Sequence, residues 1–220
     1  KGEAIFDESK DLIEEAKNTV KNLNSSYLLV QGPPGAGKTY ISAHMILSLI
    51  KDGKKVGVSS NSHKAINNLL KDVEDLADFE FSGFKKCSKK EDKLNGKYIK
   101  DISKVGKEGY DGYSLFAGTA WLFSDQALNQ KLDYLFIDEA GQVSIANTLA
   151  MCTSTKNIIL IGDQMQLSQP IKGIHPGISN KSSLEYLLEG YDTIPPEKGI
   201  YCFNDIVKIY DEDPVVQEMM

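Results

Sequence analysis

The sequence predicts an α/β fold in which a mainly parallel sheet carries helices on both faces. Short apolar runs recur along the chain, and several are followed by a segment whose apolar residues have helical spacing. The runs are almost continuously apolar and do not alternate with polar residues. That pattern is typical of strands that are buried on both faces of a sheet.

The expected elements follow one another in strand–helix order. An amphipathic helix precedes the first strand, and a Gly/Pro-rich turn leads from that strand into a helix that ends at Asp52 and Gly53. The expected helices cover residues 3–23, 41–50 and 64–76. The expected strands cover residues 27–30, 56–58, 114–117, 134–137 and 157–161.

The composition is that of a soluble globular protein. Of the 220 residues, 41% are hydrophobic and 25% are charged, and no apolar stretch approaches the roughly 18 residues that span a bilayer. The three cysteines are too widely spaced for a disulfide framework or a metal cluster, which favours reduced thiols and a cytoplasmic location. No signal-peptide pattern is present, and the start at Lys1 suggests a trimmed chain.

Charge is distributed unevenly along the chain. The net charge of −6 argues against a generally basic nucleic-acid coat protein. Residues 84–107 nevertheless hold nine lysines against three acids, and we expect a surface excursion between core strands there. Such a run could guide a nucleic-acid strand, although most charge runs are only solvated surfaces. All 25 basic residues are lysine, so the chain contains no arginine.

A Gly-rich segment after the first expected strand predicts a phosphate-binding loop, or P-loop. It fits the pattern of a Gly, four residues and Gly-Lys-Thr. Glycines let backbone N–H groups wrap around phosphate oxygens, and the following helix turns its positive end to the same anion. We expect Lys38 to bind the β- and γ-phosphates and Thr39 to ligate Mg²⁺. The expected nucleotide-binding residues are Gly32, Pro33, Pro34, Gly35, Ala36, Gly37, Lys38 and Thr39.

Two acids and a glutamine are expected to complete this site. Asp138 and Glu139 follow an expected strand, where Asp138 would hold the Mg²⁺ and Glu139 would take a proton from the attacking water. The structural alternative is that these acids cap the next helix. Gln166 follows the last expected strand and could sense the γ-phosphate. The expected catalytic residues are therefore Lys38, Glu139 and Gln166, and the expected metal ligands are Thr39 and Asp138.

Five ordered segments resemble the motifs of superfamily-one helicases. The similarity is to the branch that moves 5′ to 3′, and especially to bacterial proteins that fuse such a helicase to a RecB-like nuclease. Segments 31–35, 138–142 and 162–167 resemble motifs I, II and III, and segments 59–66 and 118–123 resemble motifs Ia and Ic. The resemblance implies a RecA-like P-loop NTPase domain with ATP as fuel and Mg²⁺ as cofactor. It also implies a single-stranded nucleic acid as partner, with DNA favoured over RNA.

Motifs Ia and Ic of that family contact the phosphate backbone of the strand. The resemblance therefore implies a nucleic-acid-binding set made of Ser60, Asn61, Ser62, His63, Lys64, Thr119, Ala120 and Trp121. Short polar side chains and N–H groups at a helix start bind phosphates without reading sequence, and Trp121 could stack on a base. Core packing is the alternative for Trp121, and a polar helix start is the alternative for His63.

The sequence departs from the family pattern in three places. No glutamine precedes Gln31, so the glutamine that recognises adenine in the family has no counterpart. The lack of arginine excludes an arginine finger from within the chain. A second RecA-like domain is not recognisable. The expected organisation is an N-terminal helix at 1–24, a motor domain at 25–200 with a lysine-rich insertion at about 80–110, and an atypical tail at 201–220.

These features predict an ATP-hydrolysing motor domain of a nucleic-acid helicase that is incomplete alone. It would need a second RecA-like domain in cis or in trans, and no membrane partner is expected. The alternative is a non-catalytic module that binds nucleotide and nucleic acid and keeps the fold without the motor. Turnover of ATP distinguishes the two, because only the first hydrolyses it.

Overall fold

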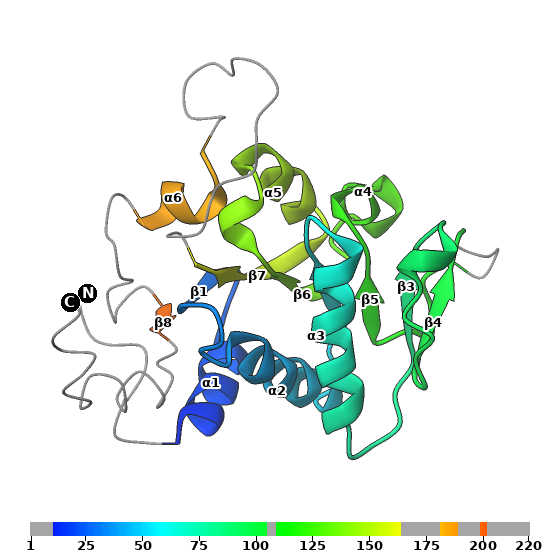
Figure 1. The fold of residues 1–220 in the computed structure, drawn as a ribbon, viewed down its shortest axis with the longest axis horizontal. Coiled ribbons are helices and arrows are strands. Elements are labelled where there is room, and N and C mark those ends of the chain that lie inside the picture. The colour runs from blue at the N-terminus through cyan, green and yellow to red at the C-terminus, as the bar shows by residue number, and fades with distance from the viewer. Residues whose placement is uncertain (1–10, 105–108, 164–180, 189–198, 202–220) are drawn as a thin grey trace, which may run out of the picture.

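Eight strands form one sheet in the computed structural model, which describes residues 11–104, 109–163, 181–188 and 199–201 (Figure 1). The strands are β1 (Tyr27–Gln31), β2 (Val56–Ser59), β3 (Gly83–Lys86), β4 (Ile99–Ile102), β5 (Leu115–Ala117), β6 (Leu132–Ile137), β7 (Thr155–Gly162) and β8 (Gly199–Tyr201). Their order across the sheet is β4-β3-β5-β2-β6-β7-β1-β8, and all neighbouring pairs are parallel. The predicted α/β fold with a parallel sheet is therefore confirmed.

Helices cover both faces of this sheet, as Figure 1 shows. One face carries α1 (Leu12–Lys21), α2 (Lys38–Lys51) and α3 (His63–Leu76). The other face carries α4 (Ala120–Phe123), α5 (Ile145–Cys152) and α6 (Ser183–Leu188). Within the described residues, the connections also contain the short 3₁₀ helices η1 (Lys90–Asp92), η2 (Gln126–Leu128) and η3 (Ala140–Gln142).

Side chains that alternate along the strands fill two separate cores. Leu28 and Val30 of β1 pack in the core beneath α1, α2 and α3, whereas Leu29 between them packs in the opposite core. In β6, Phe136 belongs to the first core and Leu135 to the second. Successive side chains of a strand point to opposite faces, so a continuous apolar run is what a sheet covered on both sides requires.

The lysine-rich segment is only partly a surface excursion, which corrects the expectation for residues 84–107. It contains β3 and β4, which extend the sheet beyond β5. Phe84 and Lys85 of β3 are fully buried, and the Phe84 ring meets the Phe116 ring edge-on at 5.4 Å between centroids. Charge counting misses such a strand, because a lysine has a long apolar stem that can lie in a core.

Several expected features lie outside the described residues. They are residues 1–10 of the N-terminal helix, Gln166 of motif III and the tail at 202–220. The described part of the N-terminal helix is α1, and β8 pairs in parallel with β1. No helix in the described part of the chain combines the length and the apolar character needed to cross a membrane.

One carboxylate attaches the start of β4 to α3. Glu74 accepts hydrogen bonds from the backbone N–H groups of Lys97, Tyr98 and Ile99 at 2.9, 2.8 and 2.9 Å. A Cβ on Gly96, just before this turn, would lie only 2.5 Å from Glu74 Oε1. Any other residue at position 96 would therefore displace the Glu74 carboxylate from these hydrogen bonds. A charged acceptor shared by three N–H groups holds the sheet edge against the helix.

Replacing Glu74 by alanine is expected to lower the free energy of unfolding by about 2–3 kcal/mol, because three N–H groups lose a charged acceptor. Chemical denaturation measures this change, and hydrogen exchange of amides 97–99 should become faster. Asp75→Ala is the matched control, since Asp75 is the neighbouring exposed acid on the same helix. Equal effects of the two substitutions would contradict this role of Glu74.

Candidate functional site

The P-loop connects β1 to α2 through two glycines in the left-handed region. Gly35 and Gly37 both have φ of +79°, a conformation that side chains other than glycine rarely adopt. Gly37 is the N-cap of α2, and no side chain caps this helix. The first turn of α2 therefore presents its backbone N–H groups and its positive end to the loop, as an anion site requires.

Lys38 is folded back onto its own loop. Its Nζ donates hydrogen bonds to the carbonyls of Gly32 at 2.6 Å and Pro33 at 2.8 Å. The ammonium group is thus held at the loop by two carbonyl acceptors. A phosphate oxygen is a stronger partner for it, because hydrogen bonds between two ionised groups are stronger than those to a neutral carbonyl.

A pocket of about 400 Å³, which we call the P-loop pocket, joins the P-loop to the loop after β6. It brings together residues that are about a hundred positions apart in the sequence, as the parallel topology predicts. The lining residues are Pro34, Gly35, Lys38, Thr39, Ala65, Asn68, Asp138, Glu139, Gly141, Gln142, Gly162 and Asp163. Six of the residues selected from the sequence for nucleotide and metal chemistry therefore share one cavity: Pro34, Gly35, Lys38, Thr39, Asp138 and Glu139.

Asp138 carries a carboxylate that is almost completely removed from water. Its side chain is 9% exposed, and burial raises its pKa to about 6. The hydrogen bond from Glu139 N to Asp138 Oδ1, at 2.8 Å, and the positive charge of Lys38 act in the opposite direction. The ionised form thus has little solvation, which is the condition in which a carboxylate gains most from a bound cation.

Asp138→Asn is expected to stabilise the protein above pH 6 in the absence of nucleotide. The folded pKa lies above the ordinary value of 3.8, so between these values the folded state keeps a proton that the unfolded state releases. Stability from this group is therefore lost as the pH rises through that window. At pH 8 the substitution should raise the free energy of unfolding by about 2–3 kcal/mol.

The gain should shrink toward pH 4, close to the ordinary pKa of 3.8, because there the folded state keeps the proton and the unfolded state has released only part of it. Urea denaturation at the two pH values measures it. Asp111→Asn is the matched control, because Asp111 is exposed and its substitution removes no buried charge. A stabilisation by Asp138→Asn that is independent of pH would contradict burial of the ionised carboxylate as its cause.

Glu139 lines the same pocket and has an unusual backbone conformation. Its φ is +53°, in the left-handed region that residues other than glycine seldom adopt. Ser60 Oγ donates a hydrogen bond to Glu139 Oε2 at 3.4 Å, and Gln142 N donates to the Glu139 carbonyl at 2.8 Å. Glu139 stands at the N-cap position of η3, but its side chain makes no capping hydrogen bond there, and Ser144 caps α5, so side-chain capping is not the role of these acids.

The start of motif III completes the pocket, while Gln166 lies outside the described residues. Gly162 ends β7, and its carbonyl accepts a hydrogen bond from Gly32 N at 3.3 Å. A Cβ on Gly162 would lie 3.2 Å from the backbone nitrogens of Ala140 and Gly141. The P-loop and the loop after β6 therefore both contact the end of β7.

A second pocket of about 450 Å³, which we call the Trp121 pocket, lies where α3, β3 and α4 meet. It brings together His63, Thr119 and Trp121, three residues of the predicted nucleic-acid-binding set. Trp121 is 85% exposed, so the alternative of core packing is wrong for this residue. The other described lining residues are Lys86, Cys87, Ser88, Lys89, Asp92 and Leu122.

The remaining residues of the predicted nucleic-acid-binding set have different surroundings. Ser60 is 3% exposed and bonds to Glu139, and the Asn61 amide donates to the carbonyl of Gln142. Ser62 caps α3 through the hydrogen bond from Ala65 N to its Oγ, at 3.1 Å. Lys64 is exposed and Ala120 is half-buried, and neither lines the Trp121 pocket as far as its described residues go.

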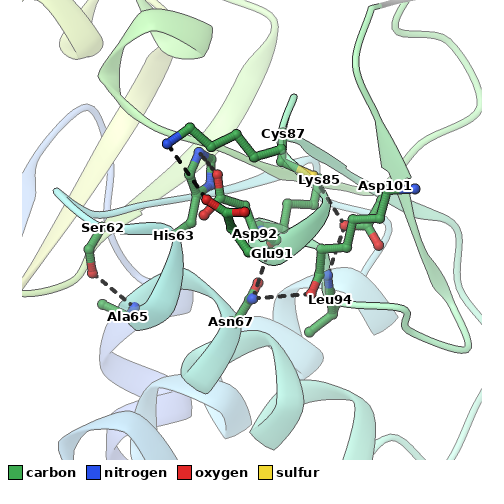
Figure 2. A network of polar contacts seen from close by, with 12 residues as sticks. Ser62, His63, Ala65, Asn67, Lys85, Cys87, Glu91, Asp92, Leu94 and Asp101 are labelled. Carbon is green, nitrogen blue, oxygen red and sulfur yellow. Dashed lines mark hydrogen bonds and ion pairs between the residues drawn. The ribbon is translucent and has the colours of Figure 1, made fainter.

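A polar network beneath the Trp121 pocket was not anticipated from the sequence. Figure 2 shows His63 of α3 pointing toward Asp92 of η1, and His63 Nε2 lies 3.8 Å from Asp92 Oδ2. Lys85 is fully buried and donates to the backbone carbonyl of Asp92, and burial lowers the pKa of its amine. Asn67 of α3 donates to the same carbonyl at 3.2 Å. The lysine-rich segment is thereby attached to the start of α3.

Comparisons with known proteins agree with the predicted resemblance to helicases. The AAA domain family matches residues 12–175 of the chain. Proteins named DNA replication ATP-dependent helicase/nuclease DNA2 are similar, with 30% identity over 179 residues in Saccharomyces cerevisiae and 27% over 158 residues in Homo sapiens. The alignments cover 71% and 66% of this chain but only 11% and 14% of those proteins. The chain thus spans a small part of the relatives it matches.

A solved structure with a similar fold is a nuclease-deletion mutant of the Type ISP restriction-modification enzyme LlaGI in complex with a DNA substrate mimic. The TM-score is 0.53 at 14% sequence identity, and the match covers 89% of this chain and 17% of that chain. At this identity the similarity extends to the fold alone. It supports the RecA-like P-loop fold that the motifs predicted.

Proposed function

The chain belongs to the AAA domain family, and we propose that it is the first motor domain of a superfamily-one DNA helicase, where it binds and hydrolyses ATP. The observation that carries this proposal is the P-loop pocket, which Lys38 and Thr39 line together with Asp138 and Glu139. Since the chain covers 11% of the yeast relative, unwinding would belong to a larger protein. That protein would supply the second RecA-like domain in cis or in trans.

The triphosphate would bind at the start of α2. The backbone N–H groups of the P-loop surround its β- and γ-phosphates, and the helix end adds a favourable dipole. Lys38 exchanges its hydrogen bonds to the carbonyls of Gly32 and Pro33 for charged bonds to phosphate oxygens. Because the ammonium group starts within the loop, this exchange needs only a change of side-chain conformation.

The residues present fit a magnesium ion. Asp138 offers a desolvated carboxylate and Thr39 a hydroxyl on the same pocket, and hard oxygen donors of this kind suit Mg²⁺. The described residues hold no cluster of three or more His, Cys, Asp or Glu side chains. The remaining ligands of the ion would be water and phosphate oxygens, as is usual for Mg²⁺. The bound ion would neutralise charge on the β- and γ-phosphates.

Glu139 would act as the general base. Its carboxylate accepts a proton from a water whose oxygen forms a bond to the γ-phosphorus, while the bond from that phosphorus to the bridging oxygen breaks. The products are ADP and phosphate. Gln166 stays a predicted sensor of the γ-phosphate. The sequence has no arginine, so an arginine finger worth typically 10³–10⁵ in rate must come from elsewhere, and we expect slow turnover by this chain alone.

Lys38→Ala is expected to weaken binding of Mg-ATP about 100-fold, because the β- and γ-phosphates lose their charged partner. Isothermal titration calorimetry measures the affinity. Lys54→Ala is the matched control, since Lys54 is an exposed lysine beyond the opposite end of α2. If Lys38→Ala bound nucleotide as tightly as the parent chain, the assignment of the P-loop pocket would be wrong.

Glu139→Gln separates the motor from a non-catalytic binding module. This substitution keeps the shape of the side chain and removes the base, so Mg-ATP should bind normally while turnover falls by about 100-fold or more. Phosphate release by the chain with and without single-stranded DNA measures turnover. A parent chain that binds ATP but shows no turnover, even when the second domain is supplied, would favour the non-catalytic module.

Single-stranded DNA would bind across the Trp121 pocket. Its lining combines an exposed indole with the ammonium groups of Lys86 and Lys89, and this mixture of a stacking surface and cationic groups suits a strand of any sequence. The names of the DNA2 relatives refer to DNA replication, which favours DNA over RNA. The Trp121 pocket lies at the carboxyl ends of the strands, and the P-loop pocket lies at the same end of the sheet.

Trp121→Ala is expected to weaken binding of oligo-dT about tenfold or more, because one base loses its stacking partner. Fluorescence anisotropy of a labelled strand measures the affinity. Leu149→Ala is the matched control, since Leu149 on α5 is also a large exposed apolar residue, at 63% exposure. A strand affinity that is the same in the two variants would place the DNA elsewhere.

A further inference from the structure

Ser60 and Asn61 lie where two neighbouring loops leave the sheet together. They follow β2, whose last residue, Ser59, pairs with Ile137 of β6. One step further, Asp138 N donates a hydrogen bond to the Ser59 carbonyl at 2.8 Å. The loop after β2 therefore runs directly alongside the loop that carries Asp138 and Glu139.

Two side-chain hydrogen bonds connect these loops. Ser60 Oγ donates to Glu139 Oε2 at 3.4 Å, and Asn61 Nδ2 donates to the carbonyl of Gln142, the last residue of η3. Ser60 is only 3% exposed, so its hydroxyl faces the protein and not a strand in solvent. The first two residues of the predicted nucleic-acid-binding set thus contact the loop of the P-loop pocket.

The backbone of Glu139 explains why such contacts are needed. A glutamate in the left-handed region is strained and persists only where its surroundings hold it. Asp138 Oδ1 accepts the Glu139 N–H, and Gln142 N donates to the Glu139 carbonyl, which closes the turn. Asn61 holds the far end of that turn and Ser60 holds the carboxylate itself.

We propose that Ser60 and Asn61 are positioning residues for ATP hydrolysis, which aim the Glu139 carboxylate, and that they transmit DNA binding to it. This inference rests on the proposed function, because Glu139 is the base of that reaction. The loop continues directly into His63, which lines the Trp121 pocket. A strand bound there acts on Glu139 through the chain segment 60–63, which runs from the Ser60 contact with Glu139 to the Trp121 pocket.

Steady-state kinetics of the full chain with single-stranded DNA tests the inference. Ser60→Ala and Asn61→Ala should each lower kcat about tenfold, a part of what a general base contributes, with KM for ATP and the DNA affinity changed less than twofold. A structural defect or a lost DNA contact would change KM or the DNA affinity instead. An unchanged kcat in both variants overturns the proposal.

Rescue and control variants make the result specific. Ser60→Thr keeps the hydroxyl and should retain most of kcat. In a chain that already carries Glu139→Gln, Ser60→Ala should cause no further loss, because the residue acts only through that carboxylate. Ser114→Ala is the matched control, since Ser114 precedes β5 at the opposite edge of the sheet, where its hydroxyl donates to the Ser82 carbonyl at 3.1 Å.

Hydrogen exchange separates failure of this inference from failure of the proposed function. A parent chain without any ATP turnover would overturn the proposed function. The link between the loops can still be measured, because exchange of amides 139–143 needs no turnover. Asn61→Ala should speed exchange of these amides about tenfold and leave those of β7 unchanged. Unaltered exchange at 139–143 overturns the inference whatever the kinetics show.

Discussion

The carboxyl end of β7 is the point on which the P-loop pocket depends. β7 lies between β1 and β6 in the sheet, so its last residue, Gly162, separates the P-loop from the loop that carries Asp138. The Gly162 carbonyl bonds to one loop, and a Cβ would press against backbone nitrogens of the other. A residue without a side chain therefore sets the spacing of both loops. A larger residue would press on the loop after β6 and on the Leu184 side chain, and so would change the shape of the pocket next to Asp138.

The charged groups of this pocket are unfavourably placed until a ligand arrives. The Asp138 carboxylate is desolvated, and the Lys38 ammonium is held by two neutral carbonyls. Under the proposed function, both groups would gain partners when a triphosphate and a divalent cation bind, so binding would also stabilise the fold. Without ligand, the buried Asp138 carboxylate lowers the stability of the protein. The left-handed backbone conformation of Glu139 also lowers the stability of the folded protein.

Much of this arrangement could be predicted from the sequence, because the P-loop and the acids after β6 depend on local patterns and on the order of strands. The directions in which individual side chains point could not be predicted from the sequence. Motif Ia predicts a loop next to nucleic acid, yet Ser60 and Asn61 turn to Glu139 and Gln142 while His63 turns to the Trp121 pocket. A motif does not contain the backbone angles that decide this. Lys85 was missed for another reason, since its burial depends on the pairing of β3 with the distant strand β5, where Lys85 lies opposite Ala117.

The hydrogen bonds to Glu74 fix the backbone at the start of β4, and β4 is an edge strand of the sheet that other molecules could approach. β4 is the terminal strand of the order, so one side of its backbone pairs with β3 and the other has no strand beside it in the described part of the chain. Exposed edge strands tend to pair with strands of other molecules, and lysine is among the residues that prevent this pairing. Lys97 and Lys100 lie at this edge of the sheet and are exposed. Their charge would keep neighbouring molecules from adding to the sheet, a protection against aggregation that operates whether or not DNA is present.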